Sequence, residues 1–87
     1  MPLKILSKPK PGYTDSARTN GKQGTIVLAV LFSANGRIEA TLVLKRLGYG
    51  LDEHAVNAAR RIKFKPKTVG GKPVQVVKMV EYSFAIY

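Results

Sequence analysis

The sequence is poorest in the residues that carry metal, redox and nucleophilic chemistry. Its 87 residues include no cysteine, no tryptophan, one histidine and five acids. Without cysteine the chain has no disulfide, no thiolate ligand and no thiol nucleophile. No run approaches the about 18–20 apolar residues that a membrane-spanning helix needs. The chain is long enough for one small domain with a single core, and we expect no metal and no cofactor in it.

Catalytic motifs are missing as well. No nucleophile lies beside a base, and no carboxylate pair or phosphate-binding glycine loop is present. His54 follows Glu53, but adjacent positions of a helix do not face each other, which argues against a proton relay. We therefore expect a protein that is not an enzyme.

The charge is strongly positive, with 15 Lys and Arg against five Asp and Glu and a net charge of +10. Such a balance favours anionic partners, and a small basic nucleic-acid-binding domain is the alternative function. Its best candidate is Arg60-Arg61 with the dense run Lys63–Lys67 that follows, in which Phe64 could stack on a base. The other interpretation is a helix C-terminus with Phe64 buried, and because the cations are otherwise dispersed we expect no nucleic acid.

The N-terminal part is predicted to be a linker. Residues 1–12 hold three prolines and three of the lysines, a composition that favours extended backbone. We assign residues 13–87 to the domain and expect it to have been cut from a longer protein with an anchor upstream. Thr14 can cap a short helix over residues 15–19, which Asn20 and Gly21 end.

A β-hairpin follows. The run from Thr25 to Phe32 alternates in hydrophobicity and is joined by Asn35-Gly36 to a second β-rich run, residues 37–45. The alternation places Ile26, Leu28, Val30 and Phe32 on one face of the first strand.

The main helix is predicted over residues 51 to about 62, with Asp52 as its N-cap. An apolar stripe recurs along it at three- and four-residue spacing, formed by Leu51, Ala55, Ala58, Ala59 and Ile62. The small residues in this stripe allow the helix to lie close to a sheet.

The last fifteen residues, 73–87, form a β-rich run without a further turn signal, so we predict one long strand that outruns its neighbour. A right-handed crossover places it beside the first strand of the hairpin. The predicted fold is α+β, a three-stranded antiparallel or mixed sheet of order 2-1-3 with one main helix on one face and a short N-terminal helix. The last strand lies at an edge, where its backbone can pair with another chain.

One face of this sheet lacks a helix. It would carry an apolar patch made by Val27, Ala29, Leu31, Leu42 and Leu44. Because exposed patches and open edges promote association, we predict that the N-terminal segment or a second copy covers this face. A homodimer of the isolated domain, by edge pairing or strand exchange, is therefore expected.

An ordered set of short motifs resembles the C-terminal domain of TonB. In chain order they are Pro11-x-Tyr13-x-x-x-Ala17, Gly24-Thr25, Asn35-Gly36-Arg37, Leu51-Asp52-x-x-Ala55, Ala59-Arg60-Arg61-x-x-Phe64-x-Pro66, Gly71-x-Pro73-Val74 and the strand containing Phe84. The resemblance extends over residues 11–87.

The resemblance implies a periplasmic domain of an energy transducer that is anchored in the inner membrane and driven by an ExbB/ExbD-type proton-powered motor. It also implies that the domain binds the Ton box, a short extended segment of an outer-membrane transporter, as a strand beside the last strand. The partner-binding residues it suggests are Pro11, Tyr13, Val74, Val76, Lys78, Val80, Tyr82, Phe84 and Ile86.

Overall fold

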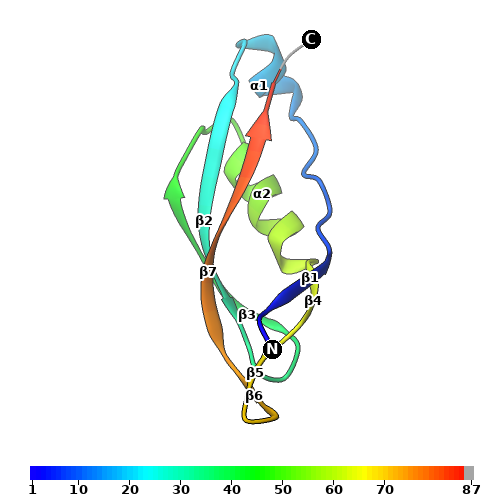
Figure 1. The fold of residues 1–87 in the computed structure, drawn as a ribbon. Helices are drawn as coiled ribbons and strands as arrows, with labels where there is room; N and C mark the ends of the chain where they lie inside the picture. The colour runs from blue at the N-terminus through cyan, green and yellow to red at the C-terminus, as the bar shows by residue number, and fades with distance from the viewer. Residues whose placement is uncertain (86–87) are drawn as a thin grey trace.

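The computed structural model describes residues 1–85 as an elongated α+β domain with extents of 50 × 20 × 15 Å (Figure 1). Within these residues, two helices and seven strands follow one another. They are β1 (Lys4–Ser7), α1 (Asp15–Thr19), β2 (Gly24–Phe32), β3 (Ile38–Lys45), α2 (Leu51–Arg60), β4 (Lys63–Lys65), β5 (Lys67–Val69), β6 (Lys72–Val74) and β7 (Val76–Phe84).

The central sheet has the order β3-β2-β7 and is antiparallel at both pairings. This order is the predicted one, with the first strand of the hairpin in the middle. The alternation of β2 is confirmed, since Ile26, Leu28 and Val30 are fully buried and Phe32 is 1% exposed. A strand that is apolar on both faces is suited to this central position.

Helix α2 covers one face of the sheet, as predicted (Figure 1). The residues of its apolar stripe are all buried and join the inner face of β2 and β7 in one core. That core consists of Ala17, Ile26, Leu28, Val30, Phe32, Leu51, Ala55, Ala58, Ala59, Ile62, Phe64, Val80, Tyr82 and Phe84. Small alanines on the helix permit this close packing.

The two helix starts differ in how well the sequence predicted them. Thr14 caps α1 as expected, its side chain accepting a hydrogen bond from the Ala17 N–H. The prediction of Asp52 as the N-cap was wrong, because α2 begins at Leu51 and its N-cap is Gly50, two residues before Asp52. The Asp52 carboxylate instead accepts from the backbone N–H groups of Leu47 and Gly48, each at 3.0 Å. It therefore fixes the loop before the helix.

The prediction of one long final strand was also wrong. The chain forms the short strand β6, which pairs with β5 in a hairpin, before β7 begins at Val76. β7 has nine residues and pairs with all nine of β2, from Gly24 opposite Phe84 to Phe32 opposite Val76. No part of β7 therefore outruns β2.

The expected linker contains regular structure. β1 pairs antiparallel with β4, Ile5 lying opposite Phe64. The N-terminal amine of Met1 donates to the Thr68 carbonyl at 2.9 Å. Leu3 and Ile5 pack against the core. The first seven residues thus belong to the folded unit.

The N-terminal segment does not cover the face of the sheet that lacks a helix, so that alternative was wrong. It lies on the side of α2, where Leu3, Ile5 and Tyr13 contact the core. The side of the sheet that lacks a helix stays accessible, and we call it the open face. It is formed by Val27, Ala29, Leu31, Leu42, Leu44, Val77 and Met79. Leu42 is 63% exposed and Met79 is 65% exposed. Its covering by a second copy stays a prediction.

Candidate functional site

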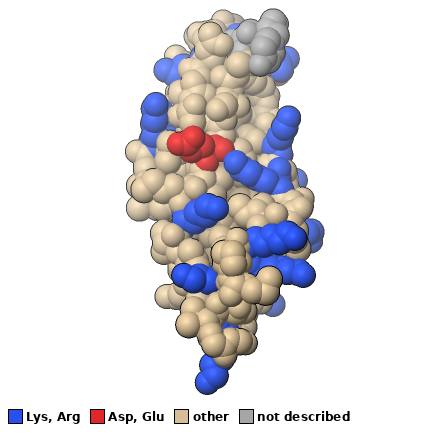
Figure 2. All heavy atoms as spheres, viewed as in Figure 1, with Lys and Arg blue, Asp and Glu red and all other residues tan. Residues whose placement is uncertain are grey.

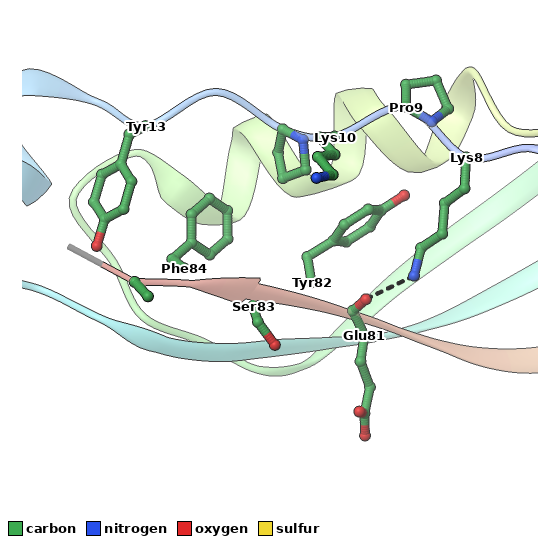
Figure 3. A pocket seen from close by; sticks show the side chains of 10 residues that line it. Lys8, Pro9, Lys10, Tyr13, Glu81, Tyr82, Ser83 and Phe84 are labelled. Atoms are coloured by element: carbon green, nitrogen blue, oxygen red, sulfur yellow. Dashed lines mark hydrogen bonds between the residues drawn. The ribbon is translucent and has the colours of Figure 1, made fainter. Parts of the chain in front are cut away.

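A groove lies between β7 and the segment that leads into α1 (Figure 3). Residues 8–13, which we call the strap, form one wall, and the C-terminal half of β7 forms the other. The groove has a volume of about 530 Å³, within the range of ligand-binding clefts. It is lined by Lys8, Pro9, Lys10, Pro11, Tyr13, Glu81, Tyr82, Ser83, Phe84 and Ala85.

The wall made by β7 is a free sheet edge. The Lys8 ammonium donates to the Glu81 carbonyl at 2.8 Å, so this carbonyl points toward the strap. In an antiparallel strand the N–H and C=O of one residue point to the same side, and this repeats every second residue. The backbone groups of Met79, Glu81 and Ser83 therefore face away from β2, which is the other neighbour of this strand. They can form a ladder with a further strand.

The strap does not form that ladder itself. Pro9 and Pro11 have no backbone N–H, so at alternate positions the strap has nothing to donate. Tyr82 and Phe84 also project from β7 toward the strap and separate the two backbones (Figure 3). The groove is consequently an extended slot with a hydrogen-bonding edge on one side.

Contacts at the C-terminal end of the strap hold it in place. The ring Nδ1 of His54 on α2 donates to the Gly12 carbonyl at 2.8 Å. The Tyr13 ring meets Phe84 edge to face with centroids 5.5 Å apart, and its hydroxyl donates to the Lys22 carbonyl. These contacts give His54 a structural role and anchor the strap to both α2 and β7.

Tyr82 forms part of the floor of the groove. Its side chain is 5% exposed, and its hydroxyl has no hydrogen-bond partner among the described residues. Burial raises the pKa of the phenol, and the positive charge of Arg61 partly opposes the rise. The Lys8 ammonium lies 4.7 Å from the centroid of the Tyr82 ring, a cation–π distance.

The structure brings together some of the residues suggested by the resemblance and separates others. Pro11, Tyr13, Tyr82 and Phe84 all line the groove. Val80 is buried in the core behind it, whereas Val76 and Lys78 lie on β7 beyond its lining. Val74 belongs to the β5–β6 hairpin. Ile86 lies outside the described residues.

Sequence reasoning missed several residues of the groove. It proposed the even-numbered positions of β7, but Val80, Tyr82 and Phe84 point their side chains into the core. The exposed backbone groups belong to Glu81 and its odd-numbered neighbours. Lys8 and Lys10 were missed because they were assigned to the linker. The alternation Lys-Pro-Lys-Pro in residues 8–11 was the available signal, since it favours an extended chain that cannot complete a ladder.

The basic run does not form a stacking site. Phe64 is 8% exposed and packs edge to face on Phe32, with centroids 4.9 Å apart. Its ring is thus unavailable to a base, in line with the interpretation that we favoured. Lysines and arginines are scattered over the visible surface rather than gathered in one patch (Figure 2). Within residues 1–85 no cluster of side chains could hold a metal ion, and no helix is long and apolar enough to cross a membrane.

Comparison with known proteins identifies the fold and the family. Residues 9–86 match the family described as the Gram-negative bacterial TonB protein C-terminal. This chain belongs to the TonB C-terminal family. The solution structure of the TonB C-terminal domain of Pseudomonas aeruginosa superposes with a TM-score of 0.76 at 26% identity, over 97% of this chain and 86% of that one. The resemblance seen in the short motifs is confirmed.

Curated TonB proteins are similar over most of this chain. The Protein TonB of Neisseria meningitidis serogroup C is 38% identical over 60 residues, 68% of this chain. That of Xanthomonas campestris pv. campestris strain B100 is 35% identical over 77 residues, 87% of this chain. The match covers only 22% and 34% of those proteins, so this chain spans between about a fifth and a third of their length. TonB proteins are energy transducers of transport, and their C-terminal domain is periplasmic.

Proposed function

We propose that this domain is the periplasmic peptide-binding end of a TonB-like energy transducer. It binds the Ton box of an outer-membrane transporter by adding it as a strand to the free edge of β7. The observation that carries the proposal is the groove between β7 and the strap, in which the Glu81 carbonyl faces away from β2. Membership of the TonB C-terminal family supports it.

Strand addition explains how a site without catalytic groups binds a partner. The Ton box would exchange main-chain hydrogen bonds with Met79, Glu81 and Ser83. Each bond contributes about 0.5–1.5 kcal/mol net, so the affinity in solution is modest. Side chains on the strap side, among them Tyr13 and Pro11, would then contact the bound segment.

The same geometry suits the transmission of force. Tension along β7 loads the hydrogen bonds to the Ton box in shear, so that they must yield together. β7 is in turn paired over its full length with β2, which passes the load to the centre of the sheet. In this proposal an ExbB/ExbD-type motor, driven by the proton motive force, pulls through a segment upstream that is anchored in the inner membrane. A bound peptide that peels off at negligible force in single-molecule pulling would contradict this part.

A titration of the labelled domain with Ton-box peptides from candidate transporters, followed by NMR, tests the docking. We expect amide shifts along residues 79–83 and in the strap. Shifts confined to Lys63–Lys67 would contradict the proposal and favour an anionic partner at the basic run. Salt-sensitive binding of DNA or RNA without any response to the peptides would do the same.

A proline substitution provides the matched test of the edge. Glu81→Pro removes an N–H that faces the groove and leaves the ladder to β2 intact, because proline is tolerated where the N–H points away from the sheet. We expect peptide affinity to fall about tenfold or more, through the lost hydrogen bond and the clash of the ring. Glu81→Ala keeps the N–H and is the control, with unchanged affinity. Equal binding by both variants would place the docking elsewhere.

We further propose that the isolated domain self-associates through this edge. The free edge of β7 adjoins the open face, where Val77 is 67% exposed and Met79 is 65% exposed. Pairing of two copies at β7 would satisfy both edges and cover part of these apolar side chains. Sedimentation should show a concentration-dependent dimer that a docked peptide dissociates. A monomer at all concentrations would exclude it.

A further inference from the structure

At the groove, the charged side chains on the two sides of β7 have opposite signs. Lys8 and Lys10 line the groove, so the charged side chains that the strap contributes to it are both cations. The carboxylate of Glu81 points to the opposite side of the strand, toward the open face (Figure 3). A segment bound in the groove therefore meets positive charge on one of its two faces.

In the free domain, Lys8 occupies a hydrogen-bond acceptor of β7 that an added strand would use. In the free domain its ammonium donates to the Glu81 carbonyl at 2.8 Å. A strand added at this edge needs that carbonyl as the acceptor for one of its own N–H groups. On docking, the ammonium loses its acceptor, while the Tyr82 ring at 4.7 Å still favours a cation beside the groove.

The pleat of the added strand determines which of its residues reaches Lys8. Residues directly opposite each other in a ladder have their side chains on the same face. The docked residue opposite Glu81 thus points to the open face. Its neighbour opposite Tyr82 points to the groove side, where Lys8 lies over the Tyr82 ring.

We propose that Lys8 is a specificity-determining residue, which selects docking segments with an Asp or Glu opposite Tyr82. The ammonium passes from the Glu81 carbonyl in the free domain to this carboxylate in the complex, and the exchange replaces a neutral acceptor by a charged one. The inference rests on the proposed function, since it specifies the peptide bound at the same edge. Lys10 adds to the positive potential that draws the acidic side chain in.

Paired peptides test the inference. The probes are ten-residue peptides with blocked ends in which Thr and Val alternate, and in which a central Thr is replaced by Glu or by Gln. The apolar Val side is drawn to Val77 and Met79 on the open face, so the replaced position faces the groove. NMR titrations measure the affinity of both peptides for the domain, for Lys8→Gln and for Lys8→Arg.

We expect the Glu peptide to bind the domain about two- to fivefold more tightly than the Gln peptide, the range for an exposed ion pair. The preference should shrink in about 0.5 M salt, because the shorter Debye length screens the attraction between exposed charges. It should vanish in Lys8→Gln and persist in Lys8→Arg. Lys72→Gln, which removes an exposed cation from the β5–β6 hairpin, is the matched control and should keep the preference.

The outcomes separate the two proposals. Equal affinities for the two peptides, or a preference that survives in Lys8→Gln, overturn the role of Lys8 and leave strand addition standing. Absence of shifts at residues 79–83 with either peptide overturns strand addition by such segments, and the selectivity with it.

Discussion

Two adjoining pieces of the N-terminal segment differ in whether they form a hydrogen-bonded ladder with the strand beside them. Residues 4–7 form β1 and pair with β4, closing that edge. Residues 8–13 run beside β7 without a ladder and leave a groove. Both pieces are extended and begin with a lysine, but the strap carries Pro9 and Pro11 whereas β1 contains no proline. Alternate prolines thus keep a neighbouring edge available, because they remove the donors that would close it.

The largest expected effect is on stability, when a side chain that anchors one of these two pieces to the domain is truncated. Phe84→Ala should lower the free energy of unfolding by about 3–5 kcal/mol, since its ring is 5% exposed and carries the edge-to-face contact with Tyr13. The strap should detach at the same time. Ile5→Ala, at the half-buried position of the otherwise exposed β1, should cost only about 1–2 kcal/mol and leave the strap in place.

Denaturant unfolding measures both losses, and the NMR signals of Gly12 and Tyr13 report the position of the strap. Phe84→Leu, which keeps apolar volume but removes the ring, serves as the intermediate control. A strap that stays docked in Phe84→Ala would show that the His54 contact to Gly12 holds it without the aromatic pair.

A smaller effect is expected when the prolines are removed. The double change Pro9→Ala and Pro11→Ala restores two N–H groups and should let the strap pair with β7 as β1 pairs with β4. Peptide affinity should then fall about two- to tenfold, the equivalent of one competing hydrogen bond. Hydrogen exchange should show new protection at the Glu81 and Ser83 amides, and Pro2→Ala is the control. Unchanged exchange at these amides would mean that the side chains of Tyr82 and Phe84, rather than the prolines, hold the backbones apart.

The smallest effect is a dependence on pH that comes from Tyr82. Burial raises its pKa above the ordinary value of 10.0, so the folded state keeps the phenol protonated at a pH where the unfolded chain releases the proton. The unfolded state then binds fewer protons, and the contribution of Tyr82 to stability, complete below pH 10, is lost as pH rises through the folded pKa. Tyr82→Phe should remove this slope, and it should not lower stability at pH 7 because the hydroxyl has no partner to lose. The measurement is a set of unfolding curves of both proteins between about pH 8 and about pH 11, at equal ionic strength. If the stabilities of the two proteins fell in parallel as pH rises, the assignment of this slope to Tyr82 would be contradicted.

Much of the fold could be predicted because the signals were local. The alternation of β2, the Asn35-Gly36 turn and the alanine stripe of α2 each depend on a few neighbouring residues, and all three are found in the structure. The errors arose where a competing interaction lay outside the local pattern. Asp52 looks like an N-cap, but the loop residues Leu47 and Gly48 take its carboxylate. The partner-binding residues stay a prediction: the resemblance suggested even-numbered positions of β7, whereas the backbone groups that face away from β2 belong to odd-numbered ones.

The sequence by itself determined the periodicity of the elements, the absence of thiol chemistry and the strongly basic character of the domain. It also carried the motifs of the TonB C-terminal family, which can be read from short stretches of the chain. Only the tertiary structure decided which backbone groups of β7 face outward, since this depends on the register with β2, set by residues about fifty positions apart. It likewise decided that Lys8 meets Glu81, a contact between residues 73 positions apart that no local pattern records.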